Sequence, residues 1–359
     1  MSLKYYSVVG MMSGTSLDGI DLILSRFHKT PKNWHYQILK AVTFDYPKDW
    51  KKKLNDAANL DAGSFLLLHK EYGSYIGDLV NSFLAESGLK ADLVASHGHT
   101  IFHQPDKGFT FQLGSGATIA ARCQLNTISD FRTLDVALGG QGAPLVPVGD
   151  ELLFGRYEFC LNLGGFANIS NRKNNIRIAF DICPVNIVTN NLALRNGQEY
   201  DKGGNMGSKG RIVPKLVEEL NNLSFYTKAA PKSLGREWVE NSFFPVLERY
   251  NLPAEDLIRN VYEHIAIQIS NYINGYKTGE VLVTGGGAFN SFLMKLIQQK
   301  SKSTLIMPEE QLVKFKEALI FAFLGLLRYR NAVNCLASVT GARCDSSSGI
   351  IDLFKKGKV

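Results

Sequence analysis

The sequence predicts an α/β protein made of two copies of one structural unit. Each half of the chain opens with three strand-like segments, and helical segments that alternate with single strands follow them. In both halves the turn after the first strand consists mainly of small or polar residues. Alternating helices and strands are typical of α/β domains. The length of 359 residues also suggests two domains, and a cleft between domains is a common small-molecule site.

In the first half, the three opening strands are predicted from apolar and β-branched segments. They are Tyr5–Met12, Ile20–Phe27 and His35–Phe44. A helical stretch is expected from Lys48 to Gly88. Two short strands should follow it, Leu93–Ser96 and Asn126–Ser129.

The same pattern recurs in the second half. The expected strands are Glu158–Leu163, Ala167–Ser170, Ile176–Ile182, Glu280–Thr284 and Ser303–Met307. A helix is predicted at Glu255–Tyr276, where an apolar residue stands at every fourth position, and a last one at Glu309–Arg330. We therefore expect an N-terminal domain of residues 1–125 plus about 340–359, and a C-terminal domain of residues 126–339.

Composition excludes several classes of protein. Lys and Arg exceed Asp and Glu by 40 to 33, which is mildly basic, so nucleic-acid binding is not expected. The longest apolar run, Ala318–Leu327, is about half of a membrane span, and the N-terminus lacks the pattern of a signal peptide, so no membrane association is expected. The five cysteines show no CxxC spacing, which fits a reducing cytoplasm. The sequence leaves open whether the chain forms a homodimer.

The turn between the first two strands is a candidate phosphate site. Its backbone N–H groups and hydroxyls can form a concave anion-binding surface, and Asp18 is a candidate for holding Mg²⁺ through water. An ordinary hairpin turn is the alternative, but a hairpin needs only about two turn residues. The candidate residues are Gly14, Thr15, Ser16, Leu17, Asp18, Gly19, Ile20 and Asp21.

Two glycine-containing turns in the second half are candidates for the same ligand. Asn162, Gly164 and Gly165 form the turn that matches the first, although a plain hairpin is again the alternative. Gly285, Gly286 and Gly287 follow a predicted buried strand and precede a helix, which lets a nucleotide approach the backbone closely. No Walker A sequence is present, so the nucleotide site is not of the P-loop type.

Three further residues and one loop carry titratable or charged side chains. Asp181 ends a predicted strand, where it is a candidate general base or a turn-capping residue. Arg132 could pair with a substrate carboxylate or lie on the surface. Glu317 begins the apolar stretch of the last helix, either on its surface or facing the cleft. The charged loop Lys232–Glu237 has no clear role.

Three histidines, His97, His99 and His103, stand within seven residues of one another. Their spacing is not a standard zinc pattern and no cysteine is close in sequence, so hydrogen-bonding histidines are favoured over metal ligands.

Together these motifs resemble the anhydro-N-acetylmuramic acid kinase family. The matching stretches span nearly the whole chain in the family's order. They are residues 14–21, 96–98, 130–132, 139–144, 162–170, 284–290 and 317–319.

The resemblance implies an actin/hexokinase-like fold of two ribonuclease-H-like domains with a central cleft that closes around the substrate. It implies that residues 14–21 bind ATP and that Mg²⁺ assists. The implied reaction opens the 1,6-anhydro ring with water and phosphorylates O6, giving N-acetylmuramic acid 6-phosphate and ADP in peptidoglycan recycling. Asp181 falls on the family's base, while Arg132, Glu317 and His97 fall on expected sugar contacts.

The chain departs from the family around the base. The family typically has Phe-Asp-Thr-Gly-Pro-Gly-Asn, whereas Ile182, Cys183 and Val185 replace the Thr and both Gly residues here. His99 stands where Gln is common, and Leu234 where Thr is common. A kinase for a different sugar, or a non-catalytic nucleotide or sugar sensor on the same fold, therefore remains an alternative.

Overall fold

The computed structural model describes residues 4–14 and 17–355, and the chain divides into two compact units. Unit 1 comprises Met1–Phe154 and Phe315–Val359, and unit 2 comprises Gly155–Lys314. These limits differ from the predicted ones at 125/126 and 339/340. The predicted strand at Asn126–Ser129 pairs with a strand of unit 1, and most of the last long helix packs on the sheet of unit 1. Both segments therefore belong to unit 1.

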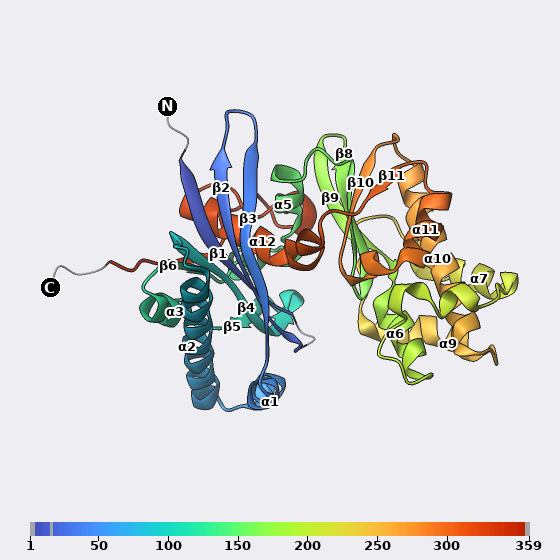
Figure 1. The fold of residues 1–359 in the computed structure, drawn as a ribbon, viewed down its shortest axis with the longest axis horizontal. Helices are drawn as coiled ribbons and strands as arrows, with labels where there is room; N and C mark the ends of the chain where they lie inside the picture. The colour runs from blue at the N-terminus through green and yellow to red at the C-terminus, as the bar shows by residue number, and fades with distance from the viewer. Residues whose placement is uncertain (1–3, 15–16, 356–359) are drawn as a thin grey trace. The chain divides into compact units, whose positions relative to one another are not determined.

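The described residues of unit 1 form a seven-stranded sheet with the order β12-β6-β4-β1-β2-β3, and β5 pairs with β4 (Figure 1). Strands β1, β2 and β3 form an antiparallel meander, while β4 runs parallel to both β1 and β6. The strands are β1 Tyr5–Ser13, β2 Gly19–Lys29, β3 Trp34–Asp45, β4 Leu93–Gln104, β5 Phe109–Leu113, β6 Asn126–Ser129 and β12 Ile350–Asp352.

Helices cover both faces of this sheet. The helices are α1 Lys48–Asp56, α2 Ala62–Ser87, α3 Gly116–Cys123, α4 Thr133–Ala137, α5 Pro147–Leu152, α12 Glu310–Tyr329 and α13 Ala337–Thr340. Val9 and Met11 join the core formed with α2, and because side chains alternate along a strand, Gly10 faces the other way. A Cβ atom on Gly10 would lie 2.2 Å from the Ala318 carbonyl oxygen. Glycine at this position therefore lets α12 pack directly on β1.

The described residues of unit 2 form a five-stranded sheet with the order β11-β10-β7-β8-β9. The strands are β7 Phe159–Leu163, β8 Phe166–Lys173, β9 Ile176–Pro184, β10 Glu280–Thr284 and β11 Thr304–Ile306. The helices are α6 Asn186–Leu194, α7 Pro214–Asn221, α8 Arg236–Trp238, α9 Phe244–Glu248, α10 Ala254–Asn274 and α11 Ser291–Lys300. The apolar face of α10 supplies much of the core of this unit.

The two sheets share one topology, which confirms the predicted duplication. In chain order within each unit, the strands lie 5-4-1-2-3, with strands 1 to 3 antiparallel and strands 4 and 5 parallel to strand 1. In unit 1 the extra strands β5 and β12 add to this common arrangement. The fold is therefore α/β, with two ribonuclease-H-like units.

Three features of unit 1 differ from the predictions. The helical stretch at residues 48–88 is interrupted, because Asp61 caps a new helix by accepting hydrogen bonds from the N–H groups of Gly63 and Ser64. Strand β4 continues eight residues beyond Ser96, to Gln104, as the first arm of a hairpin with β5. The short strand β12 was not predicted. In the part of the chain that the structure describes, no helix has the length and apolar content to cross a membrane.

Candidate active site

The turn between β1 and β2 is supported by a buried hydrogen-bond network. The Ser13 hydroxyl oxygen lies 2.8 Å from Nδ1 of His99 and 2.7 Å from the hydroxyl of Tyr46, which in turn contacts the hydroxyl of Tyr72. Burial lowers the pKa of His99 to about 4, so its ring is neutral at pH 7. This network fixes the end of β1 immediately before the predicted phosphate turn.

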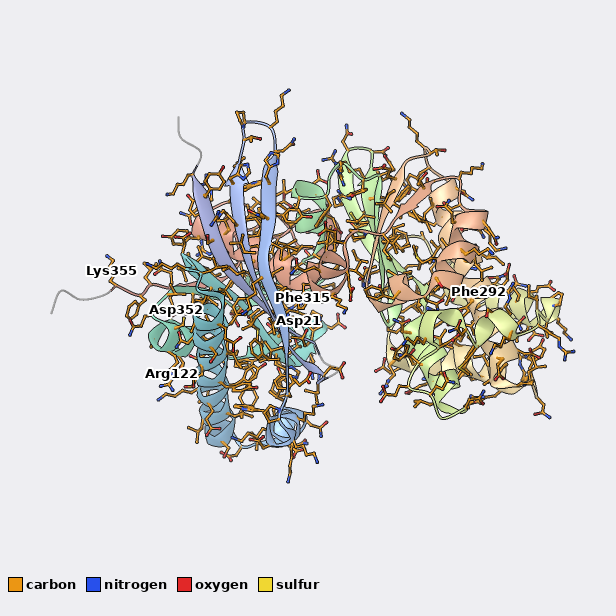
Figure 2. The ribbon with its side chains drawn as sticks, viewed as in Figure 1. Asp21, Arg122, Phe292, Phe315, Asp352 and Lys355 are labelled. Carbon is orange, nitrogen blue, oxygen red and sulfur yellow. The ribbon has the colours of Figure 1, made fainter. Side chains whose placement is uncertain are left out.

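Within that turn, Thr15 and Ser16 lie outside the described residues. Leu17 has a positive φ of 59°, and the Asp18 carbonyl accepts a hydrogen bond from the N–H of Tyr46. The Asp18 side chain is exposed. Asp21, on β2 (Figure 2), accepts a hydrogen bond of 2.6 Å from the hydroxyl of Thr43, and burial raises the pKa of its carboxyl.

Arg132 and His97, which the resemblance assigns to one substrate site, form a close pair. Nε and Nη2 of Arg132 lie 3.1 and 2.9 Å from Nε2 of His97. Burial, assisted by the charge of Arg132, holds the pKa of His97 well below its usual value. The neutral ring therefore accepts from Arg132 at Nε2 and donates from Nδ1 to the Gly98 carbonyl, 2.9 Å away.

Glu317, on α12, lies in the electrostatic field of this pair. Part of its side chain reaches solvent, but the surrounding protein removes hydration from the carboxyl, and this raises the pKa of the carboxyl. The positive charge of Arg132 opposes that rise. The negative charge of Asp21 raises the pKa of Glu317 further. The structure thus brings Arg132, His97, Glu317 and Asp21 into one electrostatically connected group.

A buried carboxylate holds the loop that supports Arg132. Nη1 of Arg132 donates to the Gly142 carbonyl at 2.6 Å, and the Gly142 N–H donates to Asp135 at 2.8 Å. Asp135 is 1% exposed and also accepts from the hydroxyl of Thr340 and the thiol of Cys335. The glycine-rich loop at residues 139–144 is therefore a support for Arg132.

The three neighbouring histidines do not converge. His97 contacts Arg132, His99 contacts Ser13, and His103 lies 3.1 Å from the hydroxyl of Thr110. Among the described residues, no group of three or more His, Cys, Asp or Glu side chains is placed to hold a metal ion.

A pocket of about 270 Å³ in unit 1 is lined in part by His97. Its wall includes His97 and Ser96 from β4, Ser129 from β6, and Asp352 from β12 (Figure 2). The pocket lies where β4 and β6 approach their common carboxyl end, which is the usual position of ligand sites in open α/β sheets.

In unit 2, the two glycine turns lie next to each other. Strands β7 and β10 are parallel neighbours with Asn162 opposite Thr284, so the turn at Gly164–Gly165 and the loop at Gly285–Gly287 both follow at the same edge. Within the described chain, the N–H groups of Gly165 and Gly286 have no hydrogen-bond acceptor. Both residues are exposed, so these donors are available to an anion.

Replacing Gly285 by Ala is expected to weaken nucleotide binding at least about tenfold. Gly285 has a φ of 84°, and an added Cβ would lie 2.7 Å from the Asn162 side-chain oxygen and 2.8 Å from the Leu163 carbonyl oxygen. The loop would have to move away from β7. Calorimetric titration with ATP measures the effect. Gly63→Ala is the control, because its Cβ would approach no atom closer than 3.3 Å; equal affinities in both variants would contradict the prediction.

Asp181 lies on β9 next to a β-bulge. Opposite Ala167 and Asn168, β9 places Cys183 and Asp181, so Ile182 is the extra residue. The Asp181 side chain is half-buried, and one oxygen accepts a 2.8 Å hydrogen bond from the N–H of Leu234. Burial raises the pKa of this carboxyl, and the Leu234 N–H partly offsets that rise. A raised pKa suits a carboxylate that must accept a proton near neutral pH.

The residues that depart from the family pattern lie in the core. Ile182 is 4% exposed, and Cys183 and Val185 are fully buried within the apolar cluster of unit 2. The changed side chains are therefore part of the apolar core of unit 2.

The chain matches the model of the anhydro-N-acetylmuramic acid kinase family over residues 6–353. The anhydro-N-acetylmuramic acid kinase of Francisella tularensis subsp. novicida (strain U112) is 33% identical to this chain over an alignment of 381 positions. The alignment covers 98% of this chain and 100% of the relative. That of Bacillus cereus (strain Q1) is 31% identical, with coverage of 94% and 96%. The chain belongs to the anhydro-N-acetylmuramic acid kinase family. Family membership makes it a kinase, which confirms the enzyme class predicted from its motifs.

A solved structure with lower similarity is a ROK family glucokinase from Streptomyces griseus, in complex with glucose and AMPPNP. It is 10% identical, with a TM-score of 0.39, and the match covers 90% of this chain and 99% of that one.

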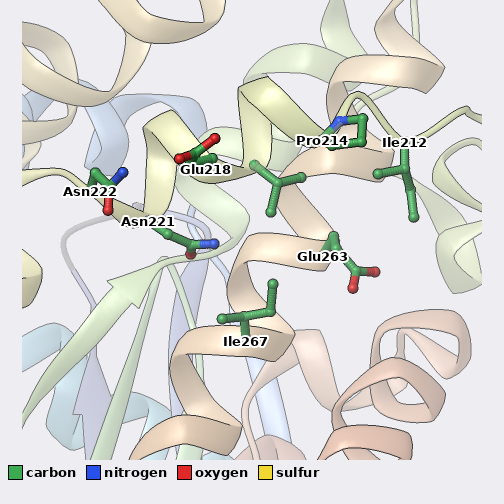
Figure 3. Close-up of a pocket in the computed structure, with 8 residues that line it drawn as sticks. Ile212, Pro214, Glu218, Asn221, Asn222, Glu263 and Ile267 are labelled. Carbon is green, nitrogen blue, oxygen red and sulfur yellow. The ribbon is translucent and has the colours of Figure 1, made fainter.

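A larger hollow in unit 2 contains none of the predicted site residues. It measures about 410 Å³ and lies between α7 and α10 (Figure 3). Its wall includes Ile212, Pro214, Glu218, Asn221, Glu263 and Ile267.

Proposed function

We propose that this kinase uses ATP to convert 1,6-anhydro-N-acetylmuramic acid into N-acetylmuramic acid 6-phosphate, with ring opening by water. The observation that carries the proposal is the state of Asp181. Oδ2 is held by the Leu234 N–H, whereas Oδ1 has no protein donor among the described residues. A fixed, half-buried carboxylate with one free oxygen is suited to take a proton from water.

In the proposed reaction, a water oxygen attacks C1 of the sugar while Asp181 accepts its proton. The bond between C1 and O6 breaks, and O6 attacks the γ-phosphorus of ATP. The bond from the γ-phosphorus to the bridging oxygen breaks, and ADP leaves. Asp181 supplies the base, and the remaining catalysis is positioning and charge stabilisation.

Arg132, His97 and Glu317 are proposed to hold the sugar. The guanidinium has further N–H donors beyond those used for His97 and Gly142, and a carboxylate such as that of the lactyl group is its natural partner. His97 fixes the plane of the guanidinium. Glu317 offers an acceptor for a sugar hydroxyl.

The glycine turns and the β1–β2 turn are proposed to hold ATP. In unit 2, the free N–H groups of Gly165 and Gly286 suit the oxygens of a polyphosphate. In unit 1, Gly14 and Asp18 belong to the turn that the sequence predicts to bind phosphate. Mg²⁺ bound with ATP would neutralise charge that develops on the transferred phosphoryl group. The exposed Asp18 carboxylate fits water-mediated contact with that ion.

Replacing Asp18 by Asn is expected to reduce the gain in ATP affinity that Mg²⁺ provides, by about tenfold. The carboxylate carries the charge that a hydrated cation needs, and the amide does not. ATP titrations with Mg²⁺ and with EDTA measure that gain without relying on turnover. The exposed Asp106→Asn is the control; the same Mg²⁺ gain in both variants would argue against a role for Asp18.

The proposed function is tested by mixing the protein with ATP, Mg²⁺ and 1,6-anhydro-N-acetylmuramic acid. The expected product is the 6-phosphate, with oxygen-18 from labelled water incorporated at C1. ATP binding without this product would overturn the proposal. Faster turnover of an ordinary hexose would favour the alternative, a kinase for a different sugar.

We also propose that the reaction serves peptidoglycan recycling in the cytoplasm. The substrate is the anhydro-amino sugar that cell-wall turnover would supply. All five cysteines are free, and four are buried, which suits a reducing compartment.

A further inference from the structure

The loop at residues 231–235, here called the base loop, binds Asp181 at two points. The Asp181 N–H donates to the Lys232 carbonyl at 3.0 Å, and the Leu234 N–H donates to Asp181 Oδ2 at 2.8 Å. The loop therefore contacts both the backbone and the carboxylate of this residue. The base loop overlaps the charged segment Lys232–Glu237, to which the sequence assigned no role.

Lys232 anchors the base loop to the interior of unit 2. Its Nζ donates to the Phe225 carbonyl at 3.1 Å and lies 4.5 Å from the centre of the Phe225 ring and 6.0 Å from that of Tyr226. Phe225 is 2% exposed, so the anchor is tied to the core. A cation over an aromatic ring and a hydrogen bond to a fixed carbonyl together restrict where the loop can lie.

We infer that Lys232 is a positioning residue for the reaction, because it holds the base loop in the place where the Leu234 N–H fixes Oδ2 of Asp181. This inference rests on the proposed function of Asp181 as the base. With Oδ2 held, the free Oδ1 keeps one orientation toward the attacking water. A base displaced by about 1 Å can lose roughly 100-fold in rate.

The hydrogen bond from the Leu234 N–H to Asp181 also explains why leucine can stand at this position. The family commonly has Thr at this position, but the hydrogen bond to Asp181 comes from the N–H group, which every residue except proline supplies. A change of side chain therefore leaves the support of Asp181 in place.

The base loop also sets the charge environment of Asp181. The groups that face this region are the ammonium groups of Lys232 and Lys228, the thiol of Cys183 and the hydroxyl of Tyr226. Burial keeps the thiol and the hydroxyl neutral by raising their pKa values. The Leu234 N–H stabilises the ionised carboxylate. If the loop moves away, the pKa of Asp181 rises, and the acid limb of the rate profile moves to higher pH.

The test compares Lys232→Met, Lys232→Arg and the control Lys277→Met, which alters an exposed lysine of unit 2 between α10 and β10. We expect Lys232→Met to lower kcat about tenfold or more, with the KM for the sugar changed less than about threefold. Lys232→Arg should recover most of the loss, because it keeps the cation and the donor.

Two results would overturn the inference. One is a kcat for Lys232→Met equal to that of Lys277→Met. The other is a loss of kcat with no change in the titration of the Asp181 carboxyl, followed by carbon-13 NMR. That titration needs no turnover, so it separates the two proposals: absence of product from the unaltered protein would refute the proposed function, whereas an unmoved titration would refute the role of Lys232.

Discussion

Replacing Asp181 by Asn is expected to lower kcat by about 10²- to 10⁴-fold while ATP affinity stays unchanged. The amide has nearly the same shape and can still accept the hydrogen bond from the Leu234 N–H through its oxygen. It cannot take a proton from water at neutral pH. Product formation followed in single turnovers, together with calorimetric ATP titration, measures both quantities.

Asp106→Asn is the matched control, because Asp106 is an exposed carboxylate between β4 and β5 and is not among the predicted site residues. Its kcat should equal that of the unaltered protein. If Asp181→Asn retained near-normal turnover, Asp181 would not be the base, even with its buried position and fixed oxygen.

The pH dependence of kcat/KM gives a second test of the role of Asp181. The base acts in its ionised form, so kcat/KM should rise as pH increases through the pKa of Asp181. Burial raises that pKa above the ordinary 3.8, so the acid limb should lie at higher pH than for an exposed aspartate. In Asp181→Asn this limb should be absent from the residual activity.

The architecture was predictable because its main strands can be recognised from short stretches of sequence. Strands β1 and β7 are short apolar runs that end in small-residue turns, and α10 carries an apolar residue at every fourth position. Such patterns depend only on neighbours in sequence. The predicted strand at Leu93–Ser96 ended too early because His97, His99 and His103 interrupt the apolar pattern. In the structure, β4 continues through these residues and pairs with β5.

The limits of the two units depend on contacts between distant segments. Strand β6 has only four residues, and what assigns it to unit 1 is its parallel pairing with β4. Strand β12 has three residues and pairs with β6 from more than 200 positions away. No local signal in such short segments reveals the partner, so the predicted domain limits differ from those of the two units.

The candidate site also contains some residues that the sequence identifies and others that only the structure identifies. Arg132 and His97 stood out by residue type, and the structure places them in hydrogen-bond contact. Their supports did not stand out, because Asp135 belongs to none of the motifs identified in the sequence and the Leu234 donor belongs to the backbone. A backbone N–H has no signature in a sequence, and its role emerges only when the fold brings it to a side chain.

Replacing Arg132 by Lys is expected to lower kcat/KM for 1,6-anhydro-N-acetylmuramic acid by about 100-fold. Lysine keeps the positive charge that Glu317 faces, but it loses the planar fork that contacts His97 and the Gly142 carbonyl. The same fork is the group that we propose binds the substrate carboxylate. The loss should depend on the lactyl carboxylate. The matching anhydro sugar without that group, 1,6-anhydro-N-acetylglucosamine, should lose much less.

The ratio of kcat/KM for the two sugars therefore separates recognition from general damage. Arg122→Lys is the matched control, since Arg122 (Figure 2) forms an exposed ion pair with Asp78 on the surface of the same unit, and such pairs contribute little. That variant should keep both the rate and the ratio. If Arg132→Lys slowed the two sugars equally, Arg132 would support the fold of the site without reading the carboxylate, and the lactyl group would have to be recognised elsewhere.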